Sequence, residues 1–348
     1  MKIAPVHAIQ IGMDFPVETG ISGRFPLFIK HGYIVLKMSG VVDQPTYALL
    51  VRAFPESYDT IHAHENVILE KLTDKTLDLT SGAVINKPVC LLYQPNKIIA
   101  GLLQTGFENG RMVVRHQQAE TSYEYAIFDN EEWAGQVTQS IGLLEHLVIA
   151  DGHHRTAAYF RIREESHEDH GLFCALLPLD QVKVHAYHRR VMMDDAQFSE
   201  FRNFFRSYYA VRFISIEEAR EIHHRLESGI DIVLLYHKGK WRKLNPLSGE
   251  ASRRKGSADL LLEFEDLVLN PFFHHSGLLA YEQVEYVSGM ELNLEDLDPE
   301  RNEVILIFPP VSRQFLWQSS LKGELMPAKS TWIEPRMPSN VIQVPNNI

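Results

Sequence analysis

The stretch from Ile149 to Thr156 constrains the fold more than any other part of this chain. It reads Ile-Ala-Asp-Gly-His-His-Arg-Thr. The apolar run from Leu147 to Ala150 predicts a short buried strand, and the apolar residues that recur after His154 predict one face of a helix. A turn from a strand into a helix leaves the first helical amides without intrahelical acceptors, at the positive end of the helix dipole. The segment therefore predicts an anion site.

Three side chains in this turn add chemistry to the helix start. Gly152 lets the backbone approach a ligand closely, and Arg155 offers a planar fork of donors that suits a phosphate. Asp151 places a carboxylate at the rim of the site. The alternative interpretation is structural, with Asp151 capping the helix and His153 and His154 forming ordinary hydrogen bonds.

Composition limits the classes of protein to which the chain can belong. It has 348 residues, 45% of them hydrophobic and 23% charged, which is typical of a globular protein. The formal net charge of -11 argues against a general nucleic-acid binder, so no nucleic-acid partner is expected. Cys90 and Cys174 are the two cysteines, too few for a disulfide framework. The N-terminus does not resemble a signal peptide and no apolar run reaches the length of a membrane span, so we expect a cytoplasmic protein without a membrane partner.

Alternating short strands and helices predict a mixed α/β (α+β) fold with two domains, residues 1–190 and 191–348. The predicted strands are 33–38, 47–54, 89–93, 111–116, 123–128, 147–150, 173–178, 182–188, 210–214, 230–237, 241–244 and 304–308. The predicted helices are 66–72, 130–144, 154–168, 198–208, 216–226, 259–269 and 314–321. Asn109-Gly110 between 98–107 and 111–116 is typical of a β-hairpin, and 243–256 is typical of a surface loop.

A second polar cluster, His62-Ala63-His64-Glu65-Asn66, precedes a predicted helix. An acid at a helix start is favoured by the dipole, so Glu65 can be purely structural. It is also the type of carboxylate that takes a proton from a hydroxyl. His62 and His64 would face the same side of a strand, and His-His pairs begin at positions 153, 223 and 274, so metal binding by histidine stays open.

A third segment, Met326 to Trp332, follows a predicted helix end at Gly323. Lys329 with the hydroxyls of Ser330 and Thr331 can hold a phosphate or a carboxylate, although a polar turn before a terminal strand explains the same residues. The chain has no Walker loop, no G-x-G-x-x-G and no G-x-S-x-G. A nucleotide site would therefore be of another type.

Taken together, the three segments resemble the ParB/sulfiredoxin superfamily in the version carried by the free serine kinases. Asp151 to Arg155 resembles its Asp-Gly-His-His-Arg signature, His64-Glu65 its His-Glu pair, and Pro327 to Thr331 its Pro-x-Lys-Ser/Thr-Thr segment. The order of the segments is the same. The strand His188-Arg189-Arg190-Val191 and the ending from Met326 to Pro335 resemble the longer bacterial branch known as a domain of unknown function, DUF1015.

The resemblance implies a ParB/sulfiredoxin-like N-terminal domain with insertions and a second α/β domain, whose C-terminal Pro-Ala-Lys-Ser-Thr segment returns to the site. Glu65 would be the general base, and Asp151 a second acid or a ligand of Mg²⁺. Phosphate or nucleotide (ADP or ATP) would be bound by a set of residues that comprises Gly152, His153, His154, Arg155 and Lys329. The serine-like substrate would be contacted by His64, Ser330 and Thr331.

Two features differ from that family. The N-terminus is short and lacks the Pro-Pro-Tyr-Asp-Val-like stretch of the branch, so no pocket residue is transferred from it. Glu65 and Asp151 are also further apart in sequence than in the compact serine kinases.

Two hypotheses of function follow. The first is a nucleotide-dependent small-molecule kinase that phosphorylates a hydroxyl of serine or a similar metabolite. The second is a nucleotide-binding regulator without transfer activity, as in the ParB relatives, and a nuclease ranks third because of the negative net charge. The nucleotide donor, the acceptor and the oligomeric state stay open.

Overall fold

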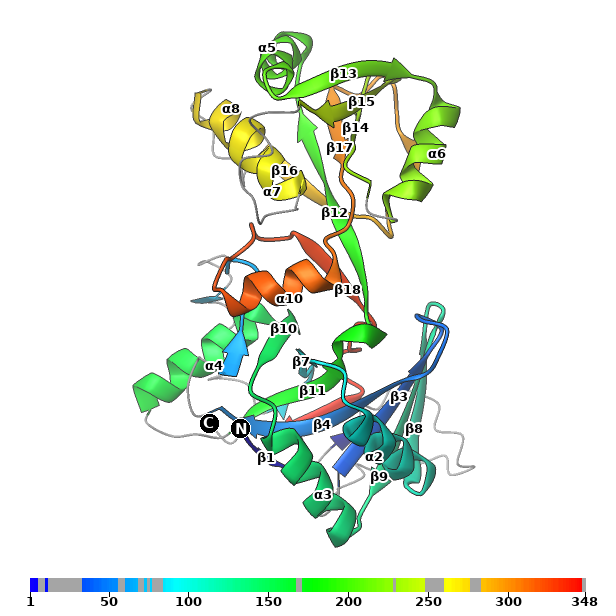
Figure 1. Ribbon diagram of the computed structural model, residues 1–348, viewed down its shortest axis with the longest axis vertical. Coiled ribbons are helices and arrows are strands. Elements are labelled where there is room, and N and C mark those ends of the chain that lie inside the picture. The colour runs from blue at the N-terminus through cyan, green and yellow to red at the C-terminus, as the bar shows by residue number, and fades with distance from the viewer. Residues whose placement is uncertain are drawn as a thin grey trace. The chain divides into compact units, whose positions relative to one another are not determined.

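The chain forms a mixed α/β structure, as predicted, with two compact units (Figure 1). The computed structural model describes residues 1–5, 10–11, 33–55, 60–67, 72–73, 76, 84–166, 171–227, 230–247, 260–275 and 283–345. The first unit contains Met1–Lys183, Ser319–Ala328 and Ile333–Ile348. The second contains Val184–Gln318 and Lys329–Trp332. These units differ from the predicted division at residue 190, because most of the C-terminal segment packs with the first unit.

A nine-stranded sheet organises the first unit. Its order is β5-β10-β7-β11-β4-β3-β9-β8, with β1 paired to β4. The strands are β1 (Lys2–Ala4), β3 (Tyr33–Ser39), β4 (Thr46–Phe54), β5 (Ile61–His62), β7 (Val89–Tyr93), β8 (Arg111–Gln118), β9 (Thr121–Phe128), β10 (Leu147–Asp151) and β11 (Leu172–Pro178). β10 lies parallel to β5 and antiparallel to β7, so the strand that leads into the Asp-Gly-His-His-Arg turn is buried between two others.

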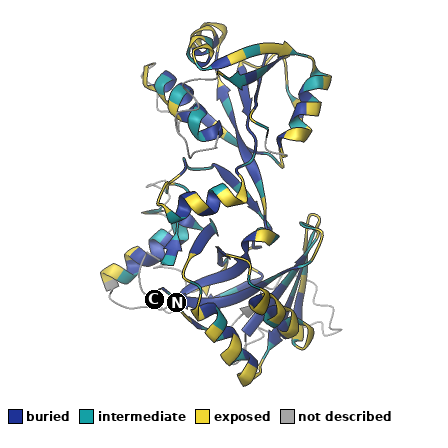
Figure 2. Cartoon of the chain, in the orientation of Figure 1, coloured by how far each residue is buried: buried dark blue, intermediate teal, exposed yellow. Residues whose placement is uncertain are grey.

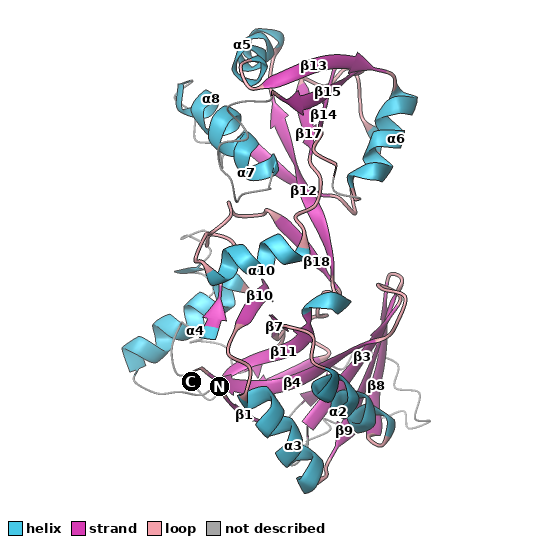
Figure 3. Ribbon diagram, viewed as in Figure 1, coloured by secondary structure: helices cyan, strands magenta, loops and turns pink. Residues whose placement is uncertain are grey.

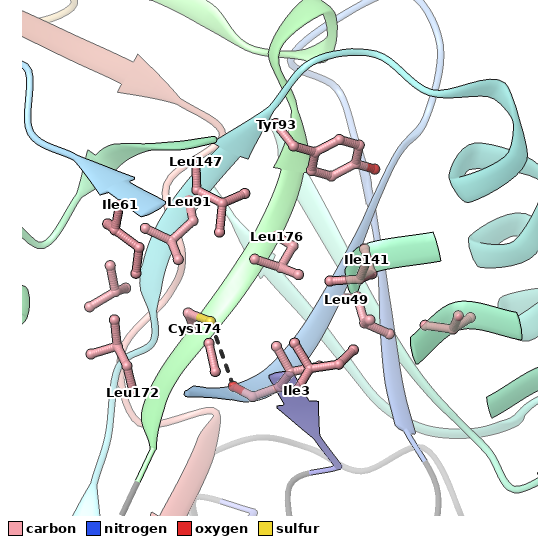
Figure 4. Close-up of a cluster of buried hydrophobic side chains, with 14 of the residues drawn as sticks. Ile3, Leu49, Ile61, Leu91, Tyr93, Ile141, Leu147, Leu172, Cys174 and Leu176 are labelled. Carbon is pink, nitrogen blue, oxygen red and sulfur yellow. Dashed lines mark hydrogen bonds between the residues drawn. The ribbon is translucent and has the colours of Figure 1, made fainter. Parts of the chain in front are cut away.

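Helices α2 (Lys97–Glu108), α3 (Glu131–Gly142) and α4 (His153–Ser166) pack on this sheet. Ile99 and Leu103 from α2 and Val137 from α3 join the core that includes the inward side chains of the strands. Figure 4 shows part of this core around Cys174, whose thiol lies 3.8 Å from the Val51 carbonyl oxygen. The outer faces of α2 and α3 are exposed (Figure 2). Burial of one helical face accounts for most of their stability.

The hairpin predicted around Asn109-Gly110 is wrong, because residues 97–108 form α2. Asn96 caps this helix by accepting hydrogen bonds from the amides of Ile98 and Ile99. Asn109 ends it, and Gly110 is required there because a Cβ would lie 2.6 Å from the carbonyl oxygen of Gly106. The hairpin is one element later, where β8 and β9 pair across 119–120.

A seven-stranded sheet organises the second unit, with the order β13-β15-β14-β17-β12-β16 and β18 paired to β12 (Figure 3). The strands are β12 (Lys183–Met192), β13 (Tyr209–Ile214), β14 (Val233–His237), β15 (Lys240–Pro246), β16 (Val284–Ser288), β17 (Glu303–Ile307) and β18 (Thr331–Glu334). Alternate residues of β14 and β17 enter two different cores. These two central strands are therefore buried on both faces, as their continuous apolar runs indicate.

Each face of this second sheet is covered by its own helices. Helix α6 (Ile216–Leu226) packs on one face, where Ile222 belongs to the same core as Leu234 and Ile305. Helix α5 (Asp195–Arg206) packs on the other face together with a helical segment that begins at Leu260. That segment comprises α7 (Leu260–Phe264), a π-helical turn (Glu265–Leu269) and α8 (Asn270–His275).

Smaller elements complete the two units. β2 (Gln10–Ile11), β19 (Ile342–Pro345) and β6 (Val84–Ile85) form a three-stranded sheet, and α10 spans Arg313–Leu321. Short 3-10 turns cover Leu179–Gln181 and Leu294–Asp296.

Four sequence predictions fall partly outside the described residues, among them the helices predicted at 154–168 and 259–269, of which 167–168 and 259 lie outside. Of the helix predicted at 66–72, Asn66 and Val67 are irregular and Leu72 is helical, and 68–71 lie outside the described residues. The loop predicted at 243–256 is wrong for 243–246, which belong to β15, and 248–256 lie outside the described residues.

Both cysteines are buried free thiols, so the predicted lack of a disulfide framework is confirmed. Among the described helices, none combines the length and the apolarity that a membrane crossing requires.

Candidate functional site

The predicted strand-to-helix turn is present, with β10 ending at Asp151 and α4 beginning at His153. Gly152 joins them with φ = +107°, a conformation that favours glycine. A Cβ at this position would also lie 3.0 Å from Nη2 of Arg155 and 3.1 Å from Val89. The first helical hydrogen bond runs from the amide of Thr156 to the carbonyl of Gly152. The amides of the first turn thus point to one end of the helix, where its dipole favours an anion.

Three cationic side chains surround the carboxylate of Asp151. Its Oδ2 lies 3.0 Å from Nη2 of Arg155 and 3.0 Å from Nζ of Lys87. Its Oδ1 accepts a hydrogen bond of 2.9 Å from Nη2 of Arg336. All four side chains are partly exposed, between 17% and 31%. The group therefore carries two positive charges in excess and is accessible to an anion from solvent.

Backbone contacts hold two of these cations in place. Arg155 Nη1 donates to the carbonyls of Lys87 and Pro88, both at 2.7 Å. The Arg336 carbonyl accepts a 2.8 Å hydrogen bond from the hydroxyl of Tyr123. Sequence reasoning found Arg155 but missed Lys87 and Arg336. Arg336 directly follows the recognised C-terminal motif, which was the available signal, and Lys87 lies in a loop that no motif marks.

The cations control the protonation of Asp151. Burial alone would raise the pKa of its carboxyl, but the nearby charges of Arg155, Lys87 and Arg336 outweigh burial and hold the pKa well below its usual range. Asp151 is therefore ionised at neutral pH. An ionised Asp151 is suited to orienting the three cations, and it is a poor proton donor.

The His-Glu motif lies beside this turn, next to the C-terminal segment. The amide of Met326 donates to the carbonyl of His64 at 2.9 Å, and the amide of Asn66 donates to the carbonyl of Met326 at 3.0 Å. Glu65 and Met326 thus form a parallel β-bridge. This pairing holds the backbone on both sides of Glu65.

Side-chain contacts bring the first two motifs together. Oε1 of Glu65 lies 3.5 Å from Nδ1 of His153, the first residue of α4, and the Glu65 side chain is 15% exposed. Nδ1 of His64 lies 2.6 Å from the carbonyl oxygen of Ile149 on β10. The rings of His64 and His153 meet edge to face, with centroids 4.4 Å apart. The carboxylate of Glu65 thus lies at the same helix start as the Asp151 turn.

Burial makes His64 a neutral imidazole. Removal from water lowers its pKa to about 4, and the hydrogen bond to Ile149 opposes that shift only in part. Since a carbonyl oxygen only accepts, Nδ1 carries the proton and Nε2 carries the lone pair. His62, predicted to share a side with His64, instead pairs with His146, with Nε2 and Nδ1 3.0 Å apart.

The third segment belongs in part to the second unit. Lys329 adopts a positive φ of 61°, and its carbonyl accepts a 3.0 Å hydrogen bond from Arg189 of β12. Its ammonium lies 5.4 Å from the ring centre of Tyr187. Ser330 and Thr331 are buried, with 1% and 8% exposure. Within that unit Arg189 also forms a buried ion pair with Glu265, with Nη2 and Oε1 2.5 Å apart. The ligand roles predicted for Lys329, Ser330 and Thr331 stay predictions.

Magnesium coordination by Asp151 does not fit this arrangement. Both carboxylate oxygens already contact cationic nitrogens at 2.9 to 3.0 Å. A magnesium ion would add two more positive charges to a carboxylate that faces three, and Mg²⁺ requires an octahedral set of oxygens. We therefore assign no step to magnesium bound by Asp151.

Comparison with known families identifies the chain. A family model described as a protein of unknown function, DUF1015, matches residues 37–263, more than half of the sequence. The chain belongs to the DUF1015 family. The match includes the His-Glu motif, the Asp151 turn and β12, so the resemblance inferred from these motifs is confirmed at the level of the family.

Similarity to individual proteins is more remote. No curated protein matched this DUF1015 chain in the comparison. Among solved structures, SbnI with a C-terminal truncation from Staphylococcus aureus is 12% identical with a TM-score of 0.47, and 86% of this chain and 87% of that chain are covered. A mutant of a free serine kinase in complex with AMP is 14% identical with a TM-score of 0.46, covering 91% and 92%. A conserved hypothetical protein from Pyrococcus furiosus is 14% identical with a TM-score of 0.44, covering 88% and 98%.

Proposed function

We propose that this DUF1015 protein is a nucleotide-dependent small-molecule kinase that transfers a phosphoryl group to the hydroxyl of serine or a similar metabolite. One observation carries the proposal: the carboxylate of Glu65 lies 3.5 Å from His153, at the helix start that follows the cation-rich Asp151 turn. Phosphoryl transfer needs positioned cations for the phosphates and a base near the attacking hydroxyl. Both parts occur at the start of α4.

The Asp151 turn would bind the phosphates of ADP or ATP. Arg155, Lys87 and Arg336 supply charge, the first turn of α4 supplies amides, and Gly152 allows close approach of the backbone. Asp151 would keep the three cations oriented when the phosphate is absent. His153 and His154 begin the helix and would lie beside the bound phosphate.

Glu65 would act as the general base. The acceptor hydroxyl oxygen attacks the terminal phosphorus of the nucleotide, so a new O–P bond forms while the bond from phosphorus to the leaving phosphate oxygen breaks. The hydroxyl proton passes to Glu65, and the negative charge on the leaving nucleotide is neutralised by the cations of the turn. In the family resemblance His64 contacts the substrate, but here it is fully buried, and its role would be to hold Glu65 in place.

The test compares the wild-type protein with Glu65→Gln and with the exposed control Glu145→Gln. Purified protein is incubated with labelled ADP or ATP, magnesium chloride and a panel of hydroxyl compounds that includes serine, and the phosphorylated product is separated and counted. We expect Glu65→Gln to lower the transfer rate by about 10²- to 10⁴-fold, the usual contribution of a general base. Nucleotide affinity, measured by equilibrium dialysis, should change little.

Three results would contradict this assignment. Full activity of Glu65→Gln would exclude Glu65 as the base. Equal loss in Glu145→Gln would indicate a non-specific effect of charge. Nucleotide binding by the wild-type protein with no turnover of any hydroxyl compound would favour the regulator over the kinase.

A further inference from the structure

His64, Glu65 and His153 form a group with the donor atoms of a metal site. Each residue offers one ligand atom, and the three atoms lie within 4.8 Å of one another. His64 and His153 are buried, with 0% and 5% exposure, and Glu65 is partly buried. Among the residues that the structure describes, this is the one such group of three or more. All three residues lie in the first unit.

The orientation of His64 is that of a metal ligand. Its Nδ1–H donates to the carbonyl of Ile149 at 2.6 Å, so the lone pair of Nε2 is on the opposite side of the ring. Metal-bound histidines commonly donate their other ring N–H to a backbone carbonyl or a carboxylate, which fixes the tautomer and the ring.

The other two donors lie close to one another. The carboxylate of Glu65 and Nδ1 of His153 are 3.5 Å apart, which is close to the separation of two ligands about 2.1 Å from one cation. The backbone supports both, because Glu65 is held by the bridge to Met326 and His153 begins α4. The site therefore needs little rearrangement to accept an ion.

The chemistry of the donor set selects the class of metal. Two imidazoles and one carboxylate suit Zn²⁺, Co²⁺ or Fe²⁺, whereas Mg²⁺ and Ca²⁺ prefer sites made of oxygen. Three protein ligands leave at least one position open for water or another small ligand.

We propose that His64, Glu65 and His153 bind one divalent transition-metal ion of the Zn²⁺ class, and that the bound ion withdraws Glu65 from proton transfer. The second half rests on the proposed function, since it requires Glu65 to be the base. A carboxylate that coordinates a divalent cation is a much weaker base, because the charge of the ion stabilises the ionised form and the coordinated oxygen is no longer available to a proton. Metal binding and phosphoryl transfer would then exclude one another at this site.

Metal binding is measured first, without any reference to activity. Chelator-treated, full-length protein is titrated with Co²⁺ under reducing conditions, and the visible absorption of the cobalt complex is recorded together with its displacement by Zn²⁺. We expect one equivalent to bind, and we expect Glu65→Gln and His153→Gln each to weaken binding at least tenfold. The matched control is His62→Asn, because His62 and His146 form an exposed pair that could hold a metal by itself.

Several outcomes would overturn the site. Absence of a stoichiometric cobalt complex would do so, and so would a complex lost in His62→Asn but kept in His153→Gln. X-ray absorption of the wild-type cobalt complex keeps the test independent of the folding of any variant, since fewer than two coordinated imidazoles would contradict the assignment.

The effect on phosphoryl transfer is measured afterwards, with Zn²⁺ added to the assay with labelled nucleotide described above. We expect wild-type activity to fall by more than tenfold as the site fills, and to return when a chelator is added. If Co²⁺ fails to bind while Glu65→Gln abolishes transfer, the metal site is wrong and the kinase proposal stands. If Zn²⁺ binds through these three residues and transfer continues unchanged, the metal site stands and Glu65 is not the base.

Discussion

His188 links the stability of the second unit to pH. It lies on β12 with 3% exposure, and its Nδ1 accepts a 3.3 Å hydrogen bond from the amide of Phe308, so the buried ring is neutral. Burial, together with the nearby charges of His223 and Arg189, lowers its pKa to about 3. The pKa in the fold is below the unfolded value of about 6.5, so protonation favours the unfolded chain. The stabilisation is complete above pH 6.5 and is lost as the pH falls towards 3.

The size of the effect follows from these two pKa values. Between pH 7 and pH 5 the unfolded chain binds most of one proton that the folded chain does not bind, which corresponds to about 2 kcal/mol. The test compares wild type with His188→Asn, since an asparagine oxygen can accept from Phe308 but does not titrate. Urea unfolding at pH 7, 6 and 5 should show that wild type loses about 2 kcal/mol more than the variant. The other histidines titrate equally in both proteins and cancel, so parallel pH dependences would refute the reasoning.

Three further substitutions test the first unit, two through its stability and one through the proposed binding of a nucleotide. Asp151→Asn leaves three cations without a counter-charge. Because the group is partly exposed, we expect the free energy of unfolding in urea to fall by about 2 kcal/mol. An unchanged midpoint would contradict the ion network. Gly106→Val would place a Cβ 2.4 Å from the ring of Trp133 and should cost about 1–3 kcal/mol, measured as a lower melting temperature. Arg336→Gln should weaken nucleotide binding by about 1.5–3 kcal/mol in equilibrium dialysis, whereas the exposed control Arg161→Gln should not. Equal nucleotide affinities of wild type and Arg336→Gln would exclude Arg336 from the proposed phosphate site.

The spacing of apolar residues along the sequence correctly predicted the elements in which that spacing is regular. Helix 216–226 and strand 89–93 have the predicted bounds, because each has a regular apolar pattern and a clear start. The pattern failed at 98–107, where Asn109-Gly110 suggested a hairpin. The competing signal was Asn96, whose side chain caps a helix that buries Ile99 and Leu103. Burial of one helical face therefore outweighed the local turn propensity of Asn109-Gly110.

The site was predictable only where consecutive residues carry the chemistry. The Asp151 turn and the His-Glu pair are each contiguous in sequence, so their local conformation and the type of ligand could be inferred. Local pattern could not predict their contact, which only the family resemblance implied, because it depends on β5 pairing with β10, which lies about 85 residues later in the chain. Lys87 and Arg336 approach Asp151 from still other segments, and only tertiary packing brings them there.

The distribution of charge at the start of α4 is compatible with the proposed base and the proposed phosphate site lying side by side. A carboxylate beside a phosphate would repel it, and the cost grows as the dielectric constant falls. Here Lys87, Arg155 and Arg336 contact Asp151, while Glu65 contacts His153 at the start of α4. Because Asp151 neutralises only part of the cationic charge, the turn still attracts an anion, while the proposed roles of Glu65 are to accept a proton or to bind a metal ion. The same separation makes the two proposals distinguishable: nucleotide binding should depend on the cations, and metal binding on the histidines.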